Sequence, residues 1–193
     1  MMNKISKRIV ERLLGKGIII KSDYDIYLFG IEQLLSIILN LLTTILIGCL
    51  FGIVWQAILF VGAFMILRSY AGGYHALTPV RCYILTIVTI IVSLSAIKYF
   101  EIDMVVLISL LIMTSVVILV LAPVDTENKP IDEIEYIYYR KKTMIVWGVE
   151  VIIALLCVAV DFLEEMKCIV CAQVVLSVVL LCERIRKKEK INL

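Results

Sequence analysis

Apolar and polar residues follow one another along this chain in long blocks. Each apolar block approaches the roughly 20 residues that a helix needs to cross the hydrocarbon core of a bilayer. The pattern predicts an all-α polytopic membrane protein, with residues 1–193 forming a single integral-membrane domain. The second and last blocks are short, so re-entrant helices remain an alternative there. The six predicted segments are Ile26–Ile47, Leu50–Leu67, Pro79–Phe100, Met104–Ala122, Met144–Leu163 and Met166–Cys182.

Residues 1–25 have a different pattern, in which basic residues are interleaved with apolar ones. Ile5, Ile9 and Leu13 recur at helical spacing, which predicts an amphipathic helix lying on the inner surface of the membrane. No apolar stretch with a small-residue cleavage site follows, so we do not expect a removable signal peptide.

Composition supports the membrane class, and the distribution of charge gives an orientation. Apolar residues make up 62% of the chain, and the mean hydropathy is +1.04, far above that of a soluble domain. Basic residues collect in the N-terminal segment, in residues 68–82, in residues 123–143 and after residue 183. The positive-inside rule therefore predicts that both termini and both of these loops are cytoplasmic. A tight turn is expected near Gly48 and Gly52.

The loop of residues 68–82 carries the strongest candidate chemistry. It contains His75, the single histidine of the chain, and Cys82 seven residues later. A base and a thiol in one short loop indicate nucleophilic catalysis by a thiolate. Seven residues of straight helix would separate the two side chains by about 10 Å. Pro79 disfavours a helix through Thr78, and this removes the difficulty.

We predict that Thr78 is the N-cap and Pro79 the first residue of the next helix. Cys82 then lies at the end of the first turn, where unpaired amides, the helix dipole and Arg81 favour a thiolate. The amides of this helix start, formed by Thr78, Val80 and Arg81, could receive a developing oxyanion.

The glycine pair of the same loop would let the chain turn sharply. Gly72 and Gly73 could bring the His75 imidazole back over the start of the next helix. The alternative is that Cys82 only packs and that His75 is an ordinary polar loop residue.

Two carboxylates lie inside apolar segments, where a charge is costly and therefore indicates function. Glu32 is near the predicted cytoplasmic end of the first segment. It could orient the His75 imidazole as the third member of a triad, or form an ion pair with Arg68 that fixes two helices. We assign no role to Glu150.

The loop of residues 123–143 is the largest polar interruption. Arg140, Lys141 and Lys142 follow an aromatic, helically spaced lead-in. They are explained by membrane topology alone, although binding of an acidic peptide segment is an alternative. Asp125 and Lys129 of the same loop are further candidates for substrate binding.

Cys168 and Cys171 have the C-x-x-C spacing of a redox pair but lack a soluble thioredoxin-like context. We therefore expect them to pack as small hydrophobic residues. Zinc-site spacing, phosphate-binding loops and nucleic-acid motifs are absent from the sequence, so no metal, no cofactor and no nucleic-acid partner is expected.

The chain resembles the AgrB family, the membrane peptidases of accessory gene regulator quorum-sensing systems. The resemblance rests on Arg68, Gly72-Gly73, His75 and Cys82, and on the stretch of residues 122–130, APVDTENKP. It is extended by the length and hydrophobic profile of nearly the whole chain.

The resemblance implies a multi-pass protein of the bacterial cell membrane whose substrate is an AgrD-like peptide precursor. Cys82 would be the nucleophile and His75 its base. Cleavage would release the C-terminal tail through a thioester, and cyclisation would give a thiolactone or lactone. A homodimer is left open. The alternatives are a small transporter using Glu32 and Glu150, or a thiol oxidoreductase using Cys168 and Cys171.

Overall fold

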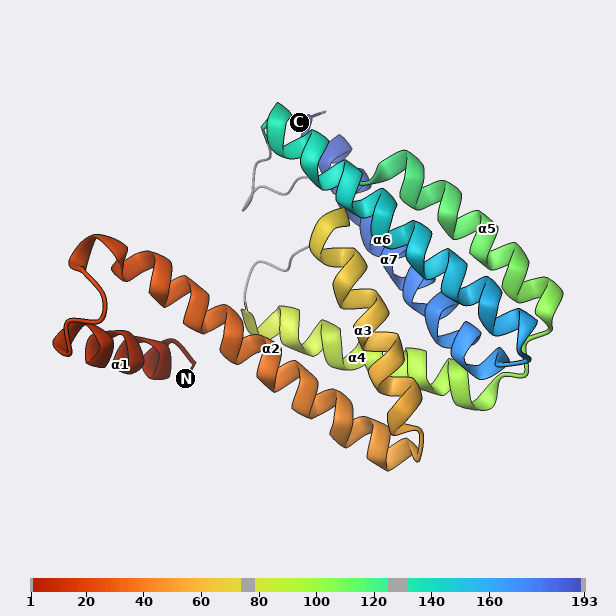
Figure 1. Cartoon of the computed structure of the whole chain (residues 1–193), viewed down its shortest axis with the longest axis horizontal. Helices are drawn as coiled ribbons and strands as arrows, with labels where there is room; N and C mark the ends of the chain where they lie inside the picture. The colour runs from red at the N-terminus through yellow and green to blue at the C-terminus, as the bar shows by residue number, and fades with distance from the viewer. Residues whose placement is uncertain (1, 74–78, 125–131, 192–193) are drawn as a thin grey trace. The chain divides into compact units, whose positions relative to one another are not determined.

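A computed structural model describes residues 2–73, 79–124 and 132–191 of the chain (Figure 1). The described residues form seven α-helices and one short 3-10 turn, Lys21–Asp23, which confirms the all-α polytopic fold. The helices are α1 (Met2–Gly15), α2 (Tyr24–Phe51), α3 (Val54–Ala71), α4 (Pro79–Tyr99), α5 (Met104–Leu121), α6 (Glu133–Ala159) and α7 (Leu163–Ile191).

Six helices of the described chain, α2 to α7, are long and apolar enough to cross a membrane. The shortest, α3 and α5, have 18 residues each, or about 27 Å of helix, close to the ~30 Å hydrocarbon core. The sixth predicted segment, for which a re-entrant helix was an alternative, lies within one uninterrupted helix, α7. The second, Leu50–Leu67, was predicted to start too early: it includes the end of α2 and the turn at Gly52, and only the part from Val54 onward belongs to α3.

The chain divides into two compact units, Met1–Thr43 and Thr44–Leu193, which are described separately. In the first unit, α1 buries Val10 and leaves Ile9 36% exposed. The helix stops at Gly15, ten residues before the predicted end, because the chain turns through Gly17 at φ 68°. The amides of Ile18 and Gly17 then bond to the carbonyls of Leu13 and Leu14, a pairing that closes many helix ends.

The second unit is built around α7. Half of the residues in the apolar stretch of α7 are buried, whereas the share is 17–28% in the other five spans. Helix α7 packs against α3, α4, α5 and α6. Its successive turns enter three apolar clusters. One contains Cys168 with residues of α3 and α4, another contains Val170 with residues of α5 and α6, and the third contains Leu176 and Leu180.

Besides the end of α1, the boundaries of two loops were predicted wrongly. Helix α2 continues through Gly48 to Phe51, and the turn comes at Gly52, with φ 72°. Gly48 instead lets α2 approach α3, because a β-carbon there would lie 3.0 Å from that of Ala57. The second error concerns the loop of residues 123–143, which ends at Asp132.

Helix α6 begins well before the predicted apolar segment because Asp132 caps it. An Asp132 carboxylate oxygen accepts a hydrogen bond from the Glu135 amide at 3.0 Å, and Glu133 and Glu135 complement the helix dipole. The basic triplet at residues 140–142 therefore lies on a helix.

Candidate active site

Cys82 lies in the first turn of α4, which begins at Pro79 as predicted. Its side chain is half-buried, whereas Val80 and Arg81 on the same turn are exposed. The amide of Val80 belongs to the group of helix-start amides that have no partner within the helix. The Cys82 carbonyl accepts a hydrogen bond from the Thr86 hydroxyl at 3.0 Å, inside α4. A thiol at this place meets the positive end of the helix dipole.

Arg68 stands in the last turn of α3. Its guanidinium lies 5.4 Å from the centre of the Phe64 ring and interacts electrostatically with Cys82. The end of α3 thus places a cation within electrostatic range of the thiol at the start of α4. A fixed positive charge stabilises a thiolate relative to a thiol.

The glycine pair connects α3 to the second family-like stretch. Gly72 and Gly73 have φ of 74° and 120°, in the region that favours glycine. The Val124 amide donates to the Ala71 carbonyl at 3.0 Å, and Gly72 pairs with Val124 in a parallel β-bridge.

Neither glycine leaves space for a side chain. A β-carbon on Gly72 would collide with the Val124 carbonyl oxygen, and one on Gly73 would lie 2.7 Å from a methyl of Val179 in α7. Two stretches that are far apart in the sequence therefore meet at this junction, which we call the Gly72–Val124 junction.

Several predicted site residues lie outside the described residues, namely His75, Thr78, Asp125 and Lys129. Glu32 lies in the unit Met1–Thr43, on α2. One of its carboxylate oxygens is shielded from solvent and has no hydrogen-bond partner among the described residues. Its orienting role, and its alternative as an ion-pair partner of Arg68, stay predictions.

The three members of the basic triplet have different surroundings. The Arg140 guanidinium donates to two carbonyls at the end of α5, those of Ala122 at 2.5 Å and Leu119 at 3.0 Å. The Lys142 ammonium lies 5.6 Å from the centre of the Tyr138 ring, and Lys141 is exposed. Substrate binding by these residues stays a prediction, and for Arg140 the structure supplies another set of partners.

A buried polar network was missed in the sequence. Glu150 is 7% exposed and accepts a hydrogen bond from the Gln173 side-chain nitrogen at 3.3 Å, while the Gln173 side-chain oxygen accepts one from the Thr114 hydroxyl at 3.3 Å. The network joins α5, α6 and α7 in the middle of the bundle. Gln173 was the available signal, because a glutamine inside an apolar span needs a partner.

Glu183 on α7 was also missed, because it lies in a charged run that is typical of a solvated tail. Its side chain is fully buried, with one carboxylate oxygen 2.8 Å from Arg186 and the other without a partner among the described residues. It follows Leu180 by one turn, and Leu180 lies beside Gly73.

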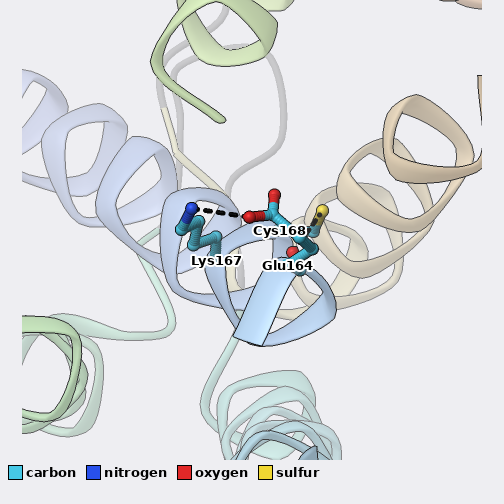
Figure 2. A network of polar contacts seen from close by, with 3 residues as sticks. All are labelled: Glu164, Lys167 and Cys168. Atoms are coloured by element: carbon cyan, nitrogen blue, oxygen red, sulfur yellow. Dashed lines mark hydrogen bonds and ion pairs between the residues drawn. The ribbon is translucent and has the colours of Figure 1, made fainter. Parts of the chain in front are cut away.

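The C-x-x-C pair packs as expected for small hydrophobic residues. Cys168 is fully buried, and its thiol donates to the Glu164 carbonyl at 3.2 Å, while Lys167 forms an ion pair with the Glu164 carboxylate at 2.7 Å (Figure 2). Cys171 is half-buried, hydrogen-bonds to Ser93 of α4 and is a free thiol, as is Cys168.

These features define a helical multi-pass membrane protein with a cysteine at a helix start, beside an arginine and a glycine turn. The accessory gene regulator B family model matches residues 2–181, so the chain belongs to the AgrB family. This links it to quorum-sensing systems.

Two curated relatives support the assignment, both named only provisionally as AgrB-like and both from Clostridium perfringens. The protein of strain 13 is 28% identical and that of strain SM101 is 29% identical, each over 138 residues. The match covers 68% of this chain and 64% of each relative. No solved structure matches the chain.

Proposed function

We propose that this protein is a membrane cysteine endopeptidase that processes an AgrD-like peptide precursor and cyclises the product. The observation that carries the proposal is the position of Cys82, half-buried in the first turn of α4 and within electrostatic range of Arg68. Membership of the AgrB family supplies the substrate class.

The first step would be attack of the Cys82 thiolate on the scissile carbonyl. The exposed first turn of α4 offers the amides of Val80 and Arg81 to the oxyanion that develops. His75 would take the thiol proton and return it to the leaving amine as the amide C–N bond breaks. The C-terminal tail would leave, and the N-terminal part would stay on Cys82 as a thioester.

The second step would close the ring. A thiol or hydroxyl of the bound precursor would attack the thioester carbonyl, form a new C–S or C–O bond and expel the Cys82 thiolate. The product would be a thiolactone or a lactone. Water attacking in place of that nucleophile would give a linear peptide, so the precursor must exclude water while it is bound.

The precursor would approach from the cytoplasm, because basic residues collect at the ends of the spans that carry Cys82 and the Gly72–Val124 junction. Tyr74→Cys and Asn128→Cys in a cysteine-free background test this orientation. We expect both positions to be protected from an impermeant thiol reagent in intact cells and labelled after lysis. Labelling from outside would contradict it.

The direct test is co-expression with the short open reading frame beside this gene, followed by mass spectrometry of the peptide products. We expect cleaved, cyclic product with the natural chain and none with Cys82→Ala. Cys182→Ala, which removes an exposed free cysteine of α7, is the control and should process normally. Wild-type processing by Cys82→Ala would contradict the mechanism. A transporter, the alternative function, would not depend on Cys82.

A further inference from the structure

Arg140 is held by the backbone of a neighbouring helix. It lies in the second turn of α6, half-buried, and its two terminal nitrogens donate to the carbonyls of Leu119 and Ala122. These are among the last carbonyls of α5, which lack partners within their own helix. A cation at this helix end also complements the dipole of α5. Two of the five N–H donors of the planar guanidinium are therefore bonded to α5 and its C-cap.

The Ala122 carbonyl, which makes the shorter of the two hydrogen bonds to Arg140, lies two residues before the Gly72–Val124 junction. Ala122 is followed two residues later by Val124, whose amide donates to the Ala71 carbonyl at 3.0 Å. Val124 also lies opposite Gly72 in the parallel bridge, where no β-carbon would fit. Two hydrogen-bond steps thus connect the Arg140 guanidinium to the end of α3.

The end of α3 carries the groups that the proposed chemistry needs. Arg68, in the last turn of α3, interacts with Cys82, and its carbonyl accepts the Gly72 amide at 3.0 Å. The segment after Gly73 contains His75. Any shift of Val124 would move Gly72, and with it the start of the segment that carries the proposed base. The surrounding apolar cluster, with Leu67, Ala122 and Leu180, keeps the junction packed.

We propose that Arg140 is a positioning residue, which holds the Gly72–Val124 junction in the geometry that the Cys82 peptidase needs and does not bind the precursor. The proposal rests on the peptidase function proposed above. Lysine would not replace it well, because one ammonium is a compact point charge and lacks the rigid fork that engages two carbonyls at once.

The test separates positioning from precursor binding. We compare purified wild type, Arg140→Lys and Lys141→Ala in detergent with a synthetic precursor, together with Arg184→Lys as the matched control. Arg184 is an exposed arginine near the end of α7. We expect Arg140→Lys to lower kcat about 100-fold, the scale of a 1 Å misplacement, with KM changed less than about twofold. Arg184→Lys should match wild type.

A precursor-free measurement completes the test. In a variant whose other five cysteines are replaced, we follow iodoacetamide alkylation of Cys82, which His75→Ala should slow. Arg140→Lys should slow it similarly, because the base is displaced, whereas loss of a precursor-binding residue would leave it unchanged. If Arg140→Lys does not fold, Val124→Pro carries the same test, because it removes the amide that bonds Ala71 while keeping the arginine.

The outcomes are distinguishable. A rise in KM with unchanged kcat and unchanged Cys82 alkylation in Arg140→Lys would make Arg140 a precursor-binding residue and overturn the inference. Wild-type kinetics in that variant or in Val124→Pro would overturn it as well. Processing that survives Cys82→Ala would instead contradict the proposed function itself. Equal defects in Arg140→Lys, Val124→Pro and the double variant would support one shared tether.

Discussion

Helix α4 passes two cysteine sites that differ in almost every physical respect. At its start, Cys82 is half-buried and lies within electrostatic range of the Arg68 cation. Toward its other end, Ile90, Leu94 and Ile97 pack against the fully buried Cys168 of α7. The Cys168 thiol is satisfied within its own helix by the Glu164 carbonyl. The same functional group thus lies at a helix start at one end of α4 and in an apolar cluster at the other.

The comparison shows that spacing within the sequence is a weaker guide to thiol reactivity than the surroundings of each thiol. Cys168 and Cys171 have the spacing of a redox pair, but one is enclosed in an apolar cluster and the other hydrogen-bonds to Ser93. A thiolate is the reactive species, and a neighbouring cation and helix-start amides favour it, whereas an apolar cluster disfavours it. Of these three cysteines, only Cys82 lies in the first turn of a helix and within electrostatic range of an arginine.

Loss of the reactive thiol should have the largest effect. Cys82→Ala and His75→Ala should each abolish precursor processing, since removal of a nucleophile or its base costs on the order of 10⁴–10⁶ in kcat. Cys82→Ser should leave at most a trace. Cys171→Ala, which changes the second cysteine of the C-x-x-C pair, should process the precursor at a rate near wild type. The check is mass spectrometry of products after co-expression. If Cys171→Ala lost processing and Cys82→Ala kept it, Cys171 and not Cys82 would be the residue needed for processing.

A smaller but still large effect is expected at the glycine turn. Gly72→Ala places a β-carbon against the Val124 carbonyl oxygen and forces alanine to φ 74°. We expect processing to fall about 100-fold, because the turn that leads to His75 must move. Gly62→Ala, within α3 and with nothing near its β-carbon, is the matched control and should keep full activity. Equal activity of the two variants would show that the junction is not needed.

The spans of this fold could be predicted from the sequence because each long apolar segment must lie in a helix in lipid. Boundaries set by local polar groups were less accessible. The start of α6 depends on a single cap, Asp132, ahead of two acidic residues. A search for apolar segments alone does not detect a polar N-cap of this kind.

The site could be predicted only where its residues are local. Cys82 and the helix start at Pro79 lie within one turn, so sequence was sufficient. The pairing of Gly72 with Val124 and the contacts of Arg140 with the end of α5 join separate parts of the chain. A single sequence does not show how its helices are aligned against one another, so it does not determine such contacts. The burial of Glu183 in a charged run has the same origin.

The rate of alkylation sharpens the comparison without any substrate. In single-cysteine variants, Cys82 should react with iodoacetamide at least about 100-fold faster than Cys168. The reason is that Cys168, fully buried, reacts only after a local opening that costs on the order of 3 kcal/mol. Mass spectrometry of the labelled protein over time gives both rates. Equal rates would mean that the end of the bundle around Cys168 opens freely.

The smallest expected effect is on the free energy of unfolding. The test makes the same substitution, cysteine to serine, at Cys168 and at Cys82. Cys168→Ser should lower the free energy of unfolding by only about 1 kcal/mol, because the serine hydroxyl can donate to the Glu164 carbonyl as the thiol does. Ser36, Ser69 and Ser95 already make this bond to the carbonyl four residues earlier.

Cys82→Ser should change stability by less than about 0.5 kcal/mol, because Cys82 is half-buried and belongs to no apolar cluster described here. Thermal unfolding in detergent measures both differences, with product analysis alongside. The prediction is therefore a crossed result: Cys168→Ser slightly destabilised and active, Cys82→Ser stable and inactive. A Cys82→Ser variant that lost more stability than Cys168→Ser would identify Cys82 as a packing residue, and its effect on processing would then have a structural cause.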